Sequence, residues 1–426
     1  MIHATDIKAF VFDSIYRTND YPYVGKWLYG CAFFTTMYII FGLVLIGIPG
    51  LSRGGIVTAL LGFSWALYGV VLKKRTFPLV LWLPVFFYSI IVLSGLLVYK
   101  YPVDAVGKLT TAWLGALMIG IFIANGLSLR FVVLSFSLII VANLATYAVG
   151  YDARVAHVLV QREFDYSIYH KVTRSTGLAG QANLLVAIVY TFPFLLFLFR
   201  KSLGVPILAS CTILCAVFMF LTASRSTIPF TVLFIVFGCL FFIRRPGAKM
   251  ISIITGVYIC IISSYLLFSY SITQYLSDSK FAKIEFIRRV LEVLNNQSGS
   301  VTVRVELASG FTRHFLEHPF LGYGPDQFKI VSGGGSYAHN NPVELLINYG
   351  FVGSIAYYSM YYYIAVKIFR YWPYNAFLIA PLLFLIATEF VFVTHLERPF
   401  SLLLCLLLLT CGNVGHHVKR KTLNFY

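Results

Sequence analysis

Long apolar stretches alternate with short polar ones along almost the whole chain. Each stretch is close to the ~20 residues that a helix needs to cross a bilayer. Because a spanning segment must satisfy its own backbone hydrogen bonds, we expect helices rather than strands. The pattern predicts an all-α, polytopic transmembrane bundle of about twelve spans, at about 27–49, 55–72, 77–99, 105–126, 131–150, 180–199, 204–222, 226–243, 250–270, 351–369, 374–394 and 399–415.

The spacing of these spans divides the chain into three parts. We expect nine transmembrane helices within 1–270, an extracytoplasmic loop at 271–350, and the last three helices with a cytoplasmic tail at 351–426. Residues 1–26 mix acidic and basic side chains and lack the pattern of a cleavable signal peptide. The first apolar run is therefore expected to stay in the membrane.

Composition supports a membrane protein and excludes several other classes. The chain is 59% hydrophobic and 12% charged, whereas soluble domains carry about 25% charged residues. Its net charge of +17 is attributed to basic cytoplasmic loops, since no basic cluster with interleaved aromatics indicates nucleic acid. The seven cysteines lie in apolar runs, so we expect neither disulfides nor zinc. No metal and no cofactor is predicted.

The distribution of Lys and Arg gives the orientation. With the N-terminus inside, most of them fall in cytoplasmic segments, as the positive-inside rule requires. Both termini should be cytoplasmic. Two extracytoplasmic segments are then long, at 151–179 and 271–350.

The second long segment contains two predicted helices. Residues 280–294 form an amphipathic pattern, which indicates a helix on the outer leaflet, against the bundle or as a lid. A second helix is expected at about 302–317, ended by His318-Pro319. On it, Arg304 shares a face with apolar residues and needs an anionic partner, either Glu306, Glu344 or a phosphate.

The stretch from His339 to Gly353 is the most informative of the chain. Asn341 is a good N-cap, Pro342 suits the first helical position, and Glu344 follows three residues after the cap, so a capped helix should begin here. Gly350 is placed to end this short helix. A histidine at a helix N-terminus can act as a base beside an anion site. It can equally be an ordinary polar residue at a span boundary.

A second candidate lies between two apolar spans. Arg225 is surrounded by small residues, Thr222-Ala223-Ser224 before it and Ser226-Thr227 after it. Small residues allow helices to approach closely, and a charge at such a boundary indicates function. The competing interpretation is an arginine that snorkels to water.

Together these stretches resemble the O-antigen ligase and polymerase superfamily over roughly the last 250 residues. The N-terminal half matches only in its hydropathy. The stretches that carry the resemblance are Gly177–Asn183, Thr222–Arg225, Arg304 with His318–Gly324, the His339–Gly353 motif, and Glu389–Arg398.

The resemblance implies a membrane glycosyltransferase of the GT-C type. Its donor would be a glycan on undecaprenyl pyrophosphate, its acceptor a sugar hydroxyl, and its reaction inverting and metal-independent. His339 matches the family's general base, while Arg225 and Arg304 match its pyrophosphate arginines. Arginine suits that task because it binds phosphate oxygens in a fork. Further candidates for substrate binding are Asn340, Arg174, Glu389 and Arg398, with His395 beside them.

Two functional questions stay open at this point. A transporter of lipid-linked glycan or a small solute is the alternative of another class, but transporters show paired charges near the middle of spans, and here most charges lie at span ends.

Within the superfamily, the choice is between a polymerase and a ligase. Loop 271–350 carries as many acidic as basic residues and attracts a phosphorylated core weakly. This favours a surface-polysaccharide polymerase over a ligase that uses lipid A–core.

The expected setting follows from that interpretation. The chain should be a multi-pass protein of the bacterial inner membrane, with its active site on the periplasmic side. Its partners would be the lipid-linked donor, the glycan or lipid A–core acceptor, membrane lipids and, for a polymerase, a chain-length regulator. No nucleic-acid partner is expected.

Overall fold

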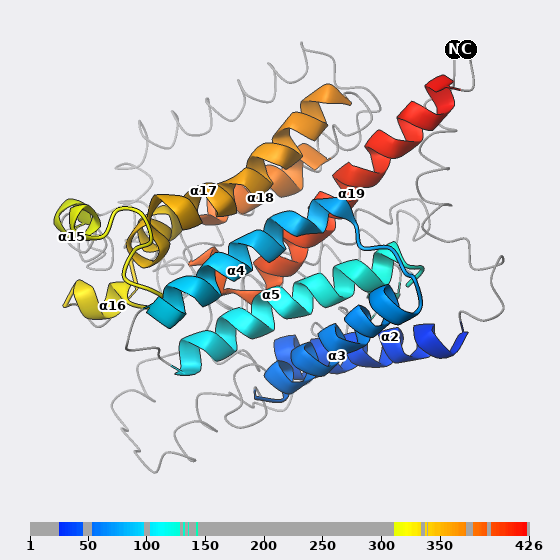
Figure 1. The fold of residues 1–426 in the computed structure, drawn as a ribbon, viewed down its shortest axis with the longest axis horizontal. Helices are drawn as coiled ribbons and strands as arrows, with labels where there is room; N and C mark the ends of the chain where they lie inside the picture. Colours follow the sequence, from blue (N-terminus) through cyan, green and yellow to red (C-terminus); the bar gives the residue numbers. More distant parts are fainter. Residues whose placement is uncertain are drawn as a thin grey trace, which may run out of the picture.

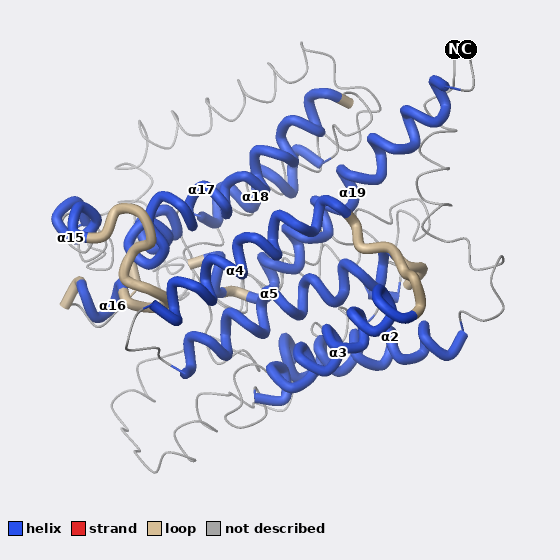
Figure 2. The backbone as a smooth tube through the Cα atoms, in the orientation of Figure 1, coloured by secondary structure: helices blue, strands red, loops and turns tan. Residues whose placement is uncertain are grey.

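The computed structural model describes residues 25–45, 53–97, 103–127, 131–132, 135, 142–143, 311–333, 337–338, 340–371, 378–389 and 393–423. Every regular element in these ranges is a helix, and none is a strand (Figure 2). The predicted all-helical class is therefore confirmed for the described part of the chain.

The N-terminal helices lie where the hydropathy pattern places spans. They are α2 (Gly25–Met37), its continuation as the π-helix η2 (Tyr38–Val44), α3 (Arg53–Leu72), the short η3 (Leu79–Leu81), α4 (Trp82–Leu97) and α5 (Val103–Ala124). Among the described helices, three are long and apolar enough to cross a membrane, at Arg53–Leu72, Leu79–Leu97 and Gly107–Ala124. The predicted spans from 180 to 270 lie outside the described residues, as does nearly all of 131–150.

The C-terminal elements begin within the predicted extracytoplasmic loop. They are α15 (Phe311–Glu317), α16 (Phe328–Val331), α17 (Asn341–Arg370), α18 (Ile379–Glu389), η7 (Thr394–Leu396) and α19 (Arg398–Leu423). Helix α15 ends immediately before His318-Pro319, as the sequence predicts, because the residue before a proline is disfavoured in the helical conformation. The expected helix at 280–294 lies outside the described residues.

The two groups of helices pack into one bundle. Helix α5 lies between α3 and α19, and α17 packs on α4 and α19. Figure 1 shows α15, α16 and the start of α17 together at one end of the bundle, while the C-terminal end of α19 reaches the opposite end. The bundle therefore separates the 338–341 segment from the last described residues of the chain.

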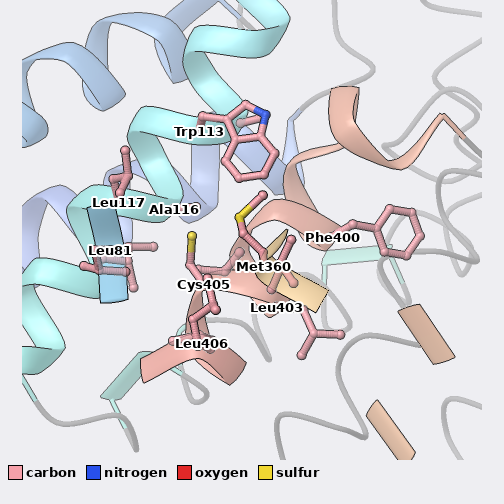
Figure 3. Close-up of a cluster of buried hydrophobic side chains, with 14 of the residues drawn as sticks. Leu81, Trp113, Ala116, Leu117, Met360, Phe400, Leu403, Cys405 and Leu406 are labelled. Atoms are coloured by element: carbon pink, nitrogen blue, oxygen red, sulfur yellow. The ribbon is translucent and has the colours of Figure 1, made fainter. Parts of the chain in front are cut away.

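The core joins helices that are distant in sequence. Trp113 of α5 and Leu81 of η3 lie with Met360 of α17 and with Leu403 and Cys405 of α19 (Figure 3). All five side chains are buried. Burial of side chains this large rigidly connects the N-terminal helices to the helix that follows His339.

Candidate active site

The N-cap of helix α17 (Asn341–Arg370) lies one residue earlier than the sequence pattern suggests. The cap is Asn340, whose backbone is extended and whose Oδ1 accepts from the Val343 amide at 3.3 Å. Asn341 is already helical, and Pro342 is therefore the second helical residue. The prediction of Asn341 as the cap was wrong, because its side chain is used in a tertiary contact instead.

Glu344 does not complete a capping box on the cap residue. Its Oε1 accepts from the amide of Ala338 at 2.7 Å, and its Oε2 accepts from Asn348 Nδ2 at 3.3 Å. The Glu344 side chain is fully buried. Its own amide donates to the carbonyl of Asn340 at 3.1 Å, within the first turn. The carboxyl thus fixes the chain before the helix rather than the cap itself.

Gly350 ends the first segment of α17, as predicted. Its φ of 61° is outside the range that other residues favour, and the helix is kinked there before it continues to Arg370. A Cβ at this position would overlap with the Phe320 carbonyl and lie 2.6 Å from Pro319 O. Only glycine allows the two backbones to lie this close.

The Pro319–Gly324 turn supplies hydrogen-bond partners for the backbone amides and carbonyls that lose their helical partners at the kink. The amides of Tyr323 and Gly324 donate to the carbonyls of Ile347 and Asn348 at 2.9 and 2.8 Å. In the other direction, Phe351 N donates to Pro319 O at 2.8 Å and Val352 N to Phe320 O at 3.1 Å. This glycine-rich turn therefore completes the backbone hydrogen bonding of the helix that follows His339.

A buried carboxyl lies at the end of α18. Glu389 is 2% exposed, and its two oxygens accept hydrogen bonds from five donors. The donors are Asn341 Nδ2 at 2.5 Å, Thr394 Oγ1 at 2.5 Å, and the hydroxyls of Tyr357, Tyr358 and Tyr361 at 3.0, 3.0 and 2.5 Å. Burying a carboxylate is tolerated only with this degree of hydrogen bonding.

Asn341 connects this carboxyl to His395. Its Oδ1 lies 3.3 Å from the backbone amide of His395 and 2.6 Å from the ring Nδ1. Since a backbone amide only donates, the amide oxygen of Asn341 faces the histidine, and Nδ1 must carry the proton. Burial also lowers the pKa of His395 to about 3. The ring is therefore neutral, with its lone pair on Nε2.

The backbone of η7 is fixed as well. Trp113 Nε1 of α5 donates to the His395 carbonyl at 3.0 Å. The ring of His395 packs edge-on against Tyr349, with centroids 5.5 Å apart. Elements from three regions of the sequence thus meet at His395, the histidine that Asn341 contacts.

Arg398 has a different environment. Its side chain is buried, and Nη1 donates to the carbonyl of Gly42 at 2.5 Å. Gly42 lies near the end of the π-helix η2, where carbonyls lack intrahelical partners and the helix dipole is negative. The arginine therefore caps that helix, and this contact gives it a structural role whatever its part in substrate binding.

Charged and aromatic groups surround the chain just before position 338. Lys108 Nζ of α5 lies 3.5 Å from the Tyr337 hydroxyl, and Lys329 Nζ lies 5.5 Å from the centre of the same ring. Lys329 also pairs with Asp326 at 2.5 Å. This end of the bundle therefore presents ammonium groups beside an aromatic ring.

The sequence-predicted site residues divide into two groups. His339, Arg225, Arg304 and Arg174 lie outside the described residues, so their predicted roles stay predictions. Asn340, Glu389 and Arg398 are described at the positions given above. The predicted alternative partner of Arg304, Glu344, has Ala338 and Asn348 as hydrogen-bond donors. Within the described ranges, no three potential ligands lie close enough together to hold a metal ion.

Sequence reasoning did not identify the partners of Glu389. The sequence pattern indicates a cap at Asn341 and an apolar span that contains Tyr357, Tyr358 and Tyr361, and neither feature predicts these hydrogen bonds. The sequence signal is their spacing. Tyr358 follows Tyr357 directly and Tyr361 lies one helical turn further on, so the three hydroxyls lie near one another on one helix. Hydroxyls inside a span require acceptors, and Glu389 is the carboxyl of the neighbouring span.

The comparison with protein families bears directly on this site. A family model described as O-Antigen ligase matches residues 210–358. The resemblance to the O-antigen ligase and polymerase superfamily is confirmed. The matched segment contains Arg225, Arg304 and His339, together with α15, α16 and the start of α17. A comparison with curated proteins found no match.

The family match supports a broad class of activity. It supports a membrane enzyme of the O-antigen ligase or polymerase type, in a family of glycosyl-transfer enzymes. Such enzymes act on a lipid-linked glycan and an acceptor. The apolar helices of the described part agree with a membrane location.

Proposed function

We propose that this chain transfers a glycan from undecaprenyl pyrophosphate to a sugar hydroxyl, as a polymerase of surface polysaccharide. The observation that carries the proposal is the family match, because its 210–358 segment contains all three residues assigned to the chemistry. The same match weighs against the alternative of a transporter, since the matched family carries out glycosyl transfer.

The reaction needs a base and a stabilised leaving group. His339 would take the proton from the acceptor hydroxyl as its oxygen attacks the anomeric carbon. The bond from that carbon to the phosphate oxygen breaks, and the pyrophosphate leaves with the bonding electrons. Arg225 and Arg304 would stabilise the negative charge that develops on the leaving lipid. Attack from the opposite face inverts the anomeric centre.

The other proposed contacts surround this centre. Asn340 would orient His339 or bind the acceptor, and Arg174 would add positive charge on the donor side. Glu389 and Arg398 remain proposed substrate-binding residues. Their hydrogen bonds to Asn341 and Gly42 support an additional role in fixing the elements around the site.

The orientation is part of the proposal. The active site would lie on the periplasmic side of the bacterial inner membrane, with both termini in the cytoplasm. Two observations support it: the positive-inside pattern, and the separation of α15 and α16 from the C-terminal end of α19 (Figure 1). The basic residues Lys367 and Arg370 in the last turn of α17 agree with a cytoplasmic end there.

A ligase is the second candidate, and the description of the matching family as O-Antigen ligase favours it. The neutral 271–350 loop favours the polymerase. Purified protein supplied only with lipid-linked repeat units distinguishes the two: a polymerase extends them, whereas a ligase reacts only when lipid A–core is added. A chain-length regulator is expected as a partner in the first case alone.

The assignment of the base is tested with His339→Ala on reconstituted protein. General-base catalysis contributes about 10²–10⁴-fold, so transfer should fall by that factor while the lipid-linked donor still binds. Parallel loss of donor binding would make His339 a binding residue. Unchanged transfer would refute its role as the base.

A further inference from the structure

One residue, Glu344, contacts both chain neighbours of His339, one through its carboxyl and the other through its backbone amide. Glu344 Oε1 accepts from the amide of Ala338 at 2.7 Å, and the Glu344 amide donates to the carbonyl of Asn340 at 3.1 Å. Ala338 and Asn340 are the two chain neighbours of the proposed base. Glu344 itself sits one turn into α17, within the rigid bundle.

The second oxygen of Glu344 extends this contact to the loop. Asn348 Nδ2 donates to Oε2 at 3.3 Å, and Asn348 Oδ1 accepts from Phe328 N at 2.9 Å, at the start of α16. Ala338 packs with Phe328 and Ile347 in a small buried cluster. The carboxyl is therefore the polar centre of the structure that joins α16, the 337–338 segment and α17.

We propose that Glu344 is a positioning residue that holds the Ala338–Asn340 segment in register for deprotonation of the acceptor. The proposal rests on the proposed function, in which His339 is the base. Misplacement of a reacting group by about 1 Å can reduce a rate about 10²-fold, so a side chain that fixes the residue before a base influences turnover without touching substrate.

The surroundings of Glu344 favour its neutral, protonated form. Asp326 and Tyr337 face it as acidic groups, and Lys329 is the nearby cation. Burial is the largest effect and raises the pKa of Glu344 to about 8. A neutral carboxyl retains one carbonyl oxygen for the Ala338 amide, and glutamine offers the same acceptor. The essential property is thus the acceptor atom rather than the charge.

Three variants test the proposal: Glu344→Ala, Glu344→Gln and Leu345→Ala. Leu345 is also fully buried and adjacent in α17, so its truncation reports general destabilisation. The measurements are kcat of transfer, donor binding and amide hydrogen exchange across 336–343. We expect Glu344→Ala to lose about 10–100-fold in kcat, to bind donor within twofold, and to exchange faster at Ala338. Glu344→Gln should retain kcat within about threefold.

Each contrary result has a defined meaning. Full kcat and unchanged exchange in Glu344→Ala would overturn the proposal, as would an equal loss of kcat in Leu345→Ala at matched melting temperature. An equal loss in Glu344→Gln would also overturn it, since glutamine retains the acceptor atom. Adding Glu344→Ala to His339→Ala should cause no further loss, because the two act as a unit.

The failure of the proposed function would look different. Full transfer by His339→Ala would refute the base while the exchange at Ala338 still reported whether Glu344 holds the segment. Conversely, loss of transfer in His339→Ala with no effect of Glu344→Ala on either kcat or exchange would refute only the positioning role.

Discussion

The side-chain amide of Asn341 donates to the carboxyl of Glu389 across 2.5 Å, although 48 residues separate them in the chain. This hydrogen bond connects the first helical residue of α17 to the last of α18. Asn341 follows His339 by two residues, so the position of the proposed catalytic segment depends on a second helix.

The first prediction concerns this bond. Glu389→Gln replaces one carboxyl oxygen, an acceptor, with an NH₂ group, a donor. Because five donors already surround this side chain, at least one of them loses its acceptor, and an unsatisfied buried polar group costs about 1–3 kcal/mol. We expect a loss of stability of that size in thermal unfolding in detergent, and a similar one for Asn341→Ala. In the double variant the losses should be less than additive. Fully additive losses would show that the two side chains act independently.

The second prediction concerns the kink. Gly350→Ala forces a Cβ into the Phe320 carbonyl at a φ of 61°, whereas Gly333 has a similar φ of 68° and no atom within 4 Å of such a Cβ. Gly333→Ala therefore measures the backbone strain alone, about 1–2 kcal/mol. Gly350→Ala should lose about 1–3 kcal/mol more, from overpacking, and lose transfer activity. Equal melting temperatures for the two variants would contradict the close backbone approach.

The third prediction concerns pH. The folded-state pKa of Glu344 is raised from 4.5 to about 8. The folded protein therefore binds this proton more tightly than the unfolded chain. Its contribution to stability is complete below pH 4.5 and is lost as the pH rises through 8, by up to about 1.4 kcal/mol per pH unit.

Glu344→Gln removes this titration, so its stability should fall less than that of wild type between pH 5 and pH 9. The difference between the two proteins isolates Glu344, because other titrating groups contribute equally to both. Parallel stability curves would show that the Glu344 pKa is not raised in the folded protein.

The fourth prediction concerns Arg225 and Arg304. Lysine keeps the charge but loses the fork that binds phosphate oxygens, so Arg→Lys should reduce turnover and Arg→Ala should reduce it further. Donor binding should weaken in the same order. The comparison requires membrane-inserted protein at equal amounts. Full activity of both alanine variants would remove the arginines from the mechanism.

The fifth prediction concerns orientation. Single cysteines at Ser336 and Thr422, introduced into a cysteine-free background, report opposite sides of the membrane. An impermeant thiol reagent added to intact cells should label the first and spare the second. The reverse pattern would invert the proposed topology.

Much of the fold could be predicted because it depends on local properties. The apolar runs at 55–72, 77–99 and 105–126 correspond closely to α3, η3 with α4, and α5. The end of the short helix at Gly350 and the end of α15 before Pro319 follow from backbone sterics of single residues. Such features need no knowledge of what lies across the bundle.

The arrangement of the candidate site could not be predicted in the same way, because it depends on contacts between residues that are distant in sequence. Asn340 and Asn341 are equally good caps, and the choice between them is decided by Glu389, on another helix. The capping-box prediction for Glu344 failed for the same reason, because its carboxyl finds the buried amide of Ala338. Long-range polar partners inside a membrane bundle are set by packing, so sequence spacing alone did not reveal them.

The four backbone hydrogen bonds between the Pro319–Gly324 turn and the Ile347–Val352 segment of α17 have a consequence for folding. The helical turn around Gly350 cannot satisfy its amides and carbonyls alone, and a buried backbone group without a hydrogen-bond partner costs free energy. The segment after His339 therefore reaches its final form only when the turn docks. Synthesis of α17 is not enough to form it, and the two segments should acquire protection from proteolysis together.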